Sequence, residues 1–213
     1  MTGPELSKGR DAAGLSAAAR RVHRAILEAF IVTGRPPEPG ELDRISALAG
    51  APPAAVREEL SVRDVVAFDE AGRIRAAYPF SPTPTGIRMT WPGGPQVFSM
   101  CAIDALGTSA MIGRPVTITA TEPGSGAGIV VEVDGDAALW RPDTAVVVVG
   151  QEGGDACCGP SVDRTCGNIN FFTTGDCAQA WTAAHPTVSS RILSGDAALA
   201  EAVDEFGLML SGT

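Results

Sequence analysis

The sequence predicts an α+β protein, in which three N-terminal helices and a hairpin precede a mixed, mostly antiparallel β core with flanking helices. Two observations support this prediction. Residues 16–60 carry apolar side chains at helical spacing in three separate segments. Residues 87–149 instead hold short runs rich in β-branched side chains, divided by Gly, Asp and Pro turns. Three helices followed by a hairpin is the order of a winged-helix domain, so we expect the N-terminal unit to be winged-helix-like.

The N-terminal elements follow from local start and stop signals. Residues 1–15 mix Gly, Pro, Ser and charge without a period, which predicts a flexible leader. The elements expected after it are a helix from Ser16 to a stop at Gly34, a helix over 41–48, a helix opening at Pro52, and a hairpin of 65–68 with 73–78. We therefore assign residues 16–80 to the winged-helix-like domain.

The remaining residues, 81–213, are expected to form the β-rich core. Prolines and a glycine over 81–86 prevent regular structure, so this segment is interpreted as a linker. The predicted core elements are strands at 87–91, 96–98, 116–121, 129–133 and 145–149, a short helix ending at Gly107, and helices over 177–185 and 196–210.

Composition excludes several classes of function. A chain of 213 residues with 45% hydrophobic content suits one large domain or two small ones. Its formal net charge of −9 argues against a nucleic-acid partner, because phosphate binding depends on clustered Lys and Arg. No apolar run approaches the roughly 20 residues that cross a bilayer, and the N-terminus lacks the pattern of a secretory signal. We expect no membrane partner and a cytoplasmic location.

Cysteine usage indicates reduced thiols. Five cysteines are an odd count in a chain without an export signal, which does not favour a disulfide framework. The two histidines, His23 and His185, do not fall at zinc-ligand spacing from a cysteine pair. Zinc is therefore not favoured.

Cys101 and Asp104 form a candidate chemical pair. If Ser99 caps a helix, Cys101 lies in its first turn, where the helix dipole lowers the pKa of a thiol. Asp104 follows three residues later and shares the same helix face. A soft nucleophile and a proton-carrying carboxyl then face one space. The alternative is that Cys101 is a small buried apolar residue and Asp104 a solvated surface acid.

A second cysteine region follows the last predicted strand. Cys166 directly precedes the alternating Ile169 and Phe171, so we expect it at the mouth of a buried strand, a position that suits a ligand. The adjacent Cys157 and Cys158 remain open to three interpretations, namely a labile disulfide, a surface pair or a catalytic role.

These residues together resemble a known family. The motifs that carry the resemblance are Cys101-Ala102-Ile103-Asp104, Ile112-Gly113-Arg114, Cys166 with its spacing to Phe171-Phe172, and Ala178 with Trp181. In this combination and order the chain resembles the alkylmercury (organomercurial) lyases over most of its length. It departs from their pattern at Met100, where an aromatic residue is common, and over 151–164, which is longer than usual.

The resemblance implies an enzyme of mercury resistance and detoxification. Such an organomercurial lyase cleaves a carbon–mercury bond by protonolysis and gives a hydrocarbon and Hg(II). The resemblance places Cys101, Asp104 and Cys166 at the catalytic positions and makes them the ligands of the Hg(II) product. If the alignment shifts, Cys158 takes the place of Cys166. It also implies no required cofactor, external thiols as reductant and acceptor, and a mercuric reductase as acceptor of Hg(II).

The proposed chemistry requires a protonated carboxyl. A free aspartate with a pKa near ~3.9 is seldom protonated at neutral pH. Asp104 must therefore collect a proton from a cysteine that binds mercury, or lie in an apolar pocket that raises its pKa.

Three rival functions remain. A regulator that binds DNA and holds a soft cation in thiolates is disfavoured by the acidic charge and the lack of a basic helix. A thiol oxidoreductase using Cys157 and Cys158 lacks the C-x-x-C spacing. A family offshoot that acts on another substrate stays open.

Overall fold

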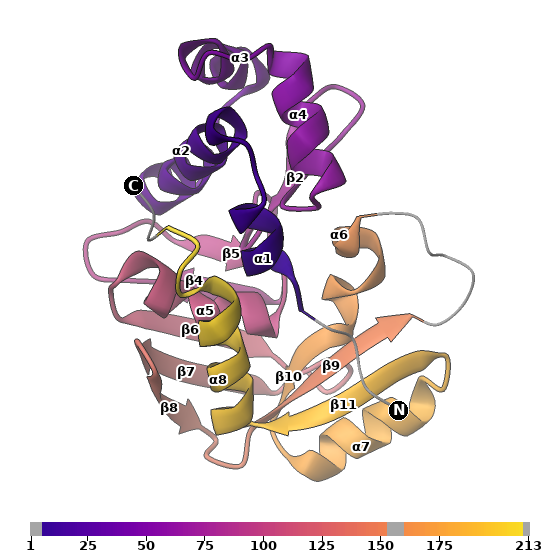
Figure 1. Cartoon of the computed structure of the whole chain (residues 1–213). Coiled ribbons are helices and arrows are strands. Elements are labelled where there is room, and N and C mark those ends of the chain that lie inside the picture. Colours follow the sequence, from indigo (N-terminus) through magenta and orange to yellow (C-terminus); the bar gives the residue numbers. More distant parts are fainter. Residues whose placement is uncertain (1–5, 153–159, 211–213) are drawn as a thin grey trace.

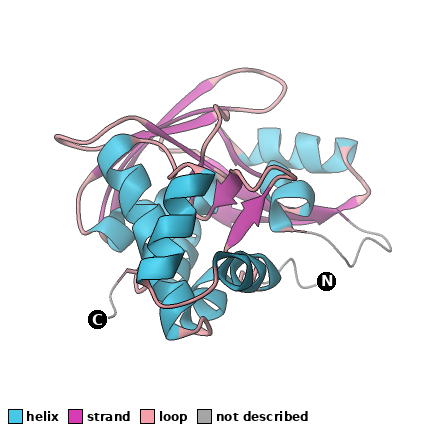
Figure 2. Cartoon of the chain, turned by 90° about the horizontal axis from the view of Figure 1, so that it is seen from above, coloured by secondary structure: helices cyan, strands magenta, loops and turns pink. Residues whose placement is uncertain are grey.

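The computed structural model of the chain describes residues 6–152 and 160–210. Two sheets with antiparallel strand pairs form its framework, an eight-stranded sheet of order β1-β2-β3-β5-β4-β6-β7-β8 and a three-stranded sheet of order β10-β9-β11 (Figure 1). Seen from above, separate groups of helices flank these strands (Figure 2). The predicted α+β class is confirmed.

The elements occur in the following order. The helices are α1 (Lys8–Ala13), α2 (Ala17–Thr33), α3 (Pro39–Leu48), α4 (Pro53–Val62), α5 (Ala102–Ile112), α6 (Ser161–Arg164), the 3-10 helix η1 (Cys166–Asn168), α7 (Gly175–Ala184) and α8 (Gly195–Phe206). The strands are β1 (Val66–Phe68), β2 (Ile74–Ala77), β3 (Phe80–Ser81), β4 (Ile87–Thr90), β5 (Val97–Ser99), β6 (Val116–Thr121), β7 (Gly128–Asp134), β8 (Ala137–Arg141), β9 (Val146–Glu152), β10 (Ile169–Phe172) and β11 (Val188–Ser194).

The N-terminal helices and hairpin lie where the sequence predicts them. The Ser16 hydroxyl accepts a hydrogen bond of 3.2 Å from the Ala19 backbone N–H and caps α2. Gly34 ends the helix with a φ of 77°, a left-handed conformation that favours glycine. The three predicted helices and the hairpin thus precede the core in the predicted order, while the likeness to a winged-helix domain stays a prediction.

The hairpin is continuous with the core sheet. β2 pairs with β3, and β3 pairs with β5, so the segment predicted as a linker begins inside a strand. Phe80 of β3 stacks on Phe30 of α2, with their ring centroids 5.2 Å apart. The N-terminal unit and the core therefore share one hydrophobic interior, and their division at residue 80 remains a proposal.

The predicted leader contains an ordered helix. α1 lies beside α8, between the helical end of the molecule and the large sheet (Figure 1). The Glu205 carboxylate accepts hydrogen bonds from the backbone N–H groups of Lys8 and Gly9, which have no partner within the helix itself. The helical conformation of α1 depends on a contact with the distant α8, so no local pattern in residues 1–15 predicts it.

The helix that carries Cys101 begins and ends later than predicted. Ser99 belongs to β5, and Cys101 itself caps α5. The helix continues through Gly107 and ends at Gly113. Gly107 is required for packing rather than termination, because a Cβ there would lie 2.5 Å from the Ala202 backbone oxygen of α8. α8 therefore packs closely along α5, directly behind the site.

The small sheet positions the second cysteine. β10 pairs antiparallel with β9, and Cys166 lies in η1 immediately before β10, as the sequence predicts. β11 pairs with the other side of β9. Neither β8 nor β11 was expected, since neither carries the uninterrupted β-branched run that marks the interior strands.

Candidate active site

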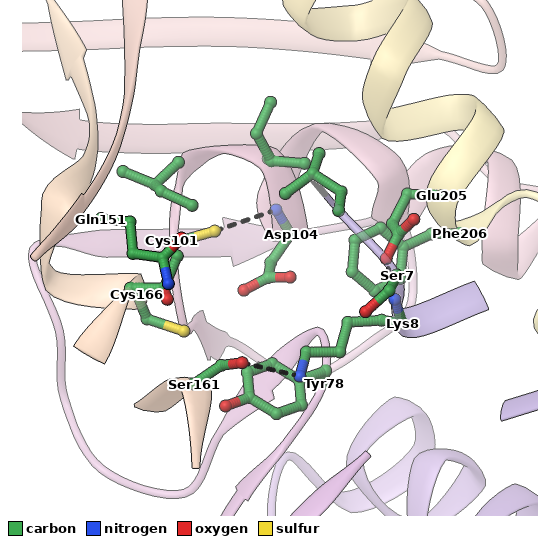
Figure 3. A pocket seen from close by; sticks show the side chains of 14 residues that line it. Ser7, Lys8, Tyr78, Cys101, Asp104, Gln151, Ser161, Cys166, Glu205 and Phe206 are labelled. Atoms are coloured by element: carbon green, nitrogen blue, oxygen red, sulfur yellow. Dashed lines mark hydrogen bonds between the residues drawn. The ribbon is translucent and has the colours of Figure 1, made fainter. Parts of the chain in front are cut away.

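A pocket of about 130 Å³ lies where α1, α5, α8 and the small sheet meet. Cys101, Asp104 and Cys166 all line it, together with Tyr78 and Lys8 (Figure 3). Apolar side chains, among them those of Ile103 and Phe206, complete its wall. The fold thus brings the three predicted site residues to one pocket.

Cys101 lies at the N-terminus of α5, with only 4% of its surface exposed. Its sulfur accepts a hydrogen bond of 3.5 Å from the Asp104 backbone N–H. Burial, followed by the negative charges of Asp104 and Cys166, nevertheless raises the pKa of the Cys101 thiol well above its usual value. The predicted lowering of this pKa is wrong, because the loss of solvent outweighs the favourable helix end.

Asp104 is a buried acid rather than a surface one. It is 4% exposed, and its Oδ2 has no hydrogen-bond partner among the described residues. Burial, with a smaller effect of the Glu205 charge, raises the pKa of Asp104 to about 7, while the hydrogen bond with Cys101 and the charge of Lys8 oppose this rise. This carboxyl can therefore accept and release a proton near neutral pH.

Cys166 is 7% exposed and faces the same space from η1. Burial and the nearby charge of Asp104 raise the pKa of its thiol, while Tyr78 and Lys8 act in the opposite direction. Both thiols consequently carry protons at neutral pH. Each must lose its proton when it binds a soft metal ion.

The raised pKa of Asp104 predicts a stability effect. The folded chain retains a proton that the unfolded chain releases near pH 3.8, so the contribution of Asp104 to stability is lost as pH rises through about 7. His23 acts in the opposite sense, because burial lowers its pKa to about 4. We therefore expect the stability of Asp104→Asn relative to the parent to rise by roughly 4 kcal/mol between pH 4 and pH 8. Denaturant unfolding of both proteins at the two pH values measures this difference, and an equal difference at both would contradict it.

The three groups share a pocket without forming a prepared metal centre. Among residues 6–152 and 160–210, no cluster of three His, Cys, Asp or Glu side chains is arranged to hold a metal ion. Figure 3 shows the carboxyl of Asp104 facing the interior of the pocket, to one side of the two sulfurs. Two sulfurs and one carboxyl thus line one pocket, contributed by α5 and η1.

Sequence reasoning missed three titratable residues of this pocket. Lys8, Tyr78 and Glu205 come from α1, from the end of the hairpin and from α8. Lys8 forms an ion pair with Asp64 and donates a hydrogen bond of 3.0 Å to Ser161. These residues are far apart in the sequence and follow no spacing rule, so only the tertiary fold reveals them.

The remaining three cysteines are not assigned to the site. Cys157 and Cys158 lie outside the described residues, and with them the alternative that Cys158 is the second thiol. Cys177 is partly buried in α7, where its sulfur accepts a hydrogen bond of 3.7 Å from the Thr173 hydroxyl. It is not among the described residues that line the pocket.

Comparison with known proteins identifies the family. Residues 80–207 match the family model of alkylmercury lyase, and this match covers more than half of the chain. The chain belongs to the alkylmercury lyase family. An alkylmercury lyase of Staphylococcus epidermidis is 32% identical over 154 residues, which span 71% of this chain and 68% of the relative. One of Streptomyces lividans is 30% identical over 155 residues, with the same two shares.

A solved structure agrees with the family's fold. The mercury-bound form of MerB2 superposes with a TM-score of 0.71 at 22% identity, covering 95% of this chain and 96% of the other. At this identity the likeness shows the fold alone. In the described part of this alkylmercury lyase family member, no helix combines the length and the apolar character needed to cross a membrane.

Proposed function

We propose that this chain is an organomercurial lyase that cleaves carbon–mercury bonds by protonolysis and yields a hydrocarbon and Hg(II). One observation carries the proposal: a buried carboxyl with a pKa of about 7 and an oxygen without a hydrogen-bond partner among the described residues shares a pocket with two buried thiols. Mercury is a soft cation that prefers sulfur. The Asp104 carboxyl supplies the proton for the carbon that is bound to mercury.

The reaction begins with ligand exchange. A small thiolate brings the organomercurial to the pocket, and Cys101 or Cys166 displaces it, leaving a sulfur–mercury–carbon unit and a free small thiol. The second cysteine then adds its sulfur to the mercury and gives its proton to ionised Asp104. Because the pKa of Asp104 is about 7, a substantial fraction of the carboxyl is ready to accept this proton at neutral pH.

Protonolysis completes the reaction. The two thiolate ligands on mercury make the bound carbon basic, and Asp104 transfers its proton to that carbon. The carbon–mercury bond breaks, the hydrocarbon leaves, and Hg(II) remains on the two thiolates. Asp104 acts first as base and then as acid, so the step needs no redox partner and no resident cofactor.

Product release requires external thiols. A bis-thiolate Hg(II) is removed by exchange with further thiols, which also keep the cysteines reduced. We propose that small cellular thiols, or a mercuric reductase, accept the ion, in keeping with a cytoplasmic location. In this proposal residues 81–213 form the catalytic unit, which contains Cys101, Asp104 and Cys166. Residues 16–80 form the N-terminal unit, which contributes Tyr78 to the pocket.

The structure does not favour a DNA-binding regulator. Arg57 on α4, the helix in the position of a recognition helix, pairs with Asp43 of α3. The acidic net charge of −9 also opposes phosphate binding.

The direct test is product analysis. The purified chain, incubated with phenylmercury and excess thiol at neutral pH, is expected to release benzene, which gas chromatography measures. Benzene and protein-bound Hg(II) should form in equal amounts during the first turnover. Tight binding of phenylmercury without benzene would overturn the proposal and favour an offshoot that only binds mercury.

A further inference from the structure

Tyr78 is a buried polar residue that the proposed reaction leaves unused. It is 1% exposed and follows β2, yet its side chain lines the pocket beside Cys166 (Figure 3). Its hydroxyl meets no acceptor with hydrogen-bond geometry among the described residues. A buried hydroxyl without a partner is costly, so its position calls for an explanation.

The Tyr78 ring is held in place by a cation. The Lys8 ammonium lies 4.2 Å from the centroid of the ring. Lys8 is itself fixed by hydrogen bonds of 2.7 Å to the Asp64 carbonyl and 3.0 Å to the Ser161 hydroxyl. α1, α6 and the hairpin therefore meet at this ring, which fixes the direction of its hydroxyl.

The Tyr78 hydroxyl and the Cys166 sulfur face the same part of the pocket (Figure 3), and each group is among the causes that shift the pKa of the other. Burial raises the pKa of Tyr78, so its O–H stays protonated and remains a donor. A neutral thiol is a weak acceptor, whereas a sulfur that carries negative charge is a better one. The hydroxyl thus gains its partner when Cys166 exchanges its proton for mercury.

We propose that Tyr78 is a positioning residue for Cys166: its O–H donates a hydrogen bond to the sulfur as that sulfur becomes charged, and so directs it toward the mercury. No bond of Tyr78 breaks in this step, because the Cys166 proton passes to Asp104 or to a leaving thiolate. The inference rests on the proposed function for the identity of the metal ion, while its test uses Hg(II) binding alone.

The test compares Tyr78→Phe in two backgrounds. In both, Cys157, Cys158 and Cys177 are replaced with serine, and one background also carries Cys166→Ser. Hg(II), supplied as its complex with a small thiol, is mixed rapidly with each protein, and ultraviolet absorption by mercury–thiolate bonds reports the rate of capture. Phenylalanine fills the same space, and circular dichroism checks the fold of each variant.

With Cys166 present, Tyr78→Phe is expected to slow capture about tenfold, the order of a hydrogen bond to a charged group. With Cys166→Ser, the same change should alter capture by less than about twofold, since the two sites then no longer interact. Equal slowing in both backgrounds, or no slowing in the first, would overturn the role of Tyr78. If capture depends on Tyr78 but phenylmercury yields no benzene, the proposed function fails while this inference stands.

Discussion

Replacing Cys166 with serine is expected to lower the rate of benzene release from phenylmercury by at least about a thousandfold. Serine offers a hard oxygen that mercury binds poorly, so a single sulfur at Cys101 leaves the bound carbon too weakly basic to take a proton. Binding of phenylmercury should persist through Cys101. Gas chromatography of single turnovers, with bound phenylmercury measured by mass spectrometry, separates capture from cleavage.

Cys177→Ser is the matched control for this variant. Cys177 is another described free cysteine, but it lies in α7 and is not among the residues that line the pocket. Its replacement should leave benzene release within about twofold of the parent, because distant sites act independently. If Cys166→Ser stays active and Cys158→Ser does not, the second thiol is Cys158.

Asp104→Asn is expected to lower benzene release at least about a hundredfold, the scale of a lost general acid. Asparagine has nearly the same shape but neither accepts the proton of a thiol nor delivers one to carbon. Both sulfurs remain, so phenylmercury should accumulate intact on the protein. Without this base the second thiol keeps its proton, so the two-sulfur species does not form by this route, as in Cys166→Ser.

Mass spectrometry of the loaded Asp104→Asn protein, together with benzene analysis, separates the expected result from two others. Full benzene release by Asp104→Asn would show that the proton comes from another source, such as Glu205 or solvent. Loss of phenylmercury binding would instead assign Asp104 a role in capture.

Local sequence signals predicted most of the fold. α2, α4 and the interior strands carry strong periodicity or β-branched runs, and clear caps such as Ser16 and Gly34 fixed the ends of α2. The elements that the sequence did not predict correctly share one cause. Contacts with distant elements determine that α1 is helical, how long α5 is and where β11 pairs. The close approach of α8 to Gly107 is an example.

The sequence predicted which cysteines and which acid form the site better than it predicted the direction of their pKa shifts. Cys101 and Asp104 followed from their spacing, and Cys166 from its place before a buried strand and from the family resemblance. The direction of the Cys101 pKa shift did not follow, because the helix-end rule holds for partly exposed thiols and this one is buried. Lys8 and Tyr78 enter the pocket through tertiary packing alone.

Mercury-edge X-ray absorption after one turnover with phenylmercury tests the central claim most directly. The sample is the full chain with Cys157, Cys158 and Cys177 replaced by serine and the free small thiol removed. The account predicts two sulfur ligands on Hg(II), contributed by Cys101 and Cys166, and a single one when Cys166 is also replaced. A single sulfur in the first protein, or two in both, would contradict it.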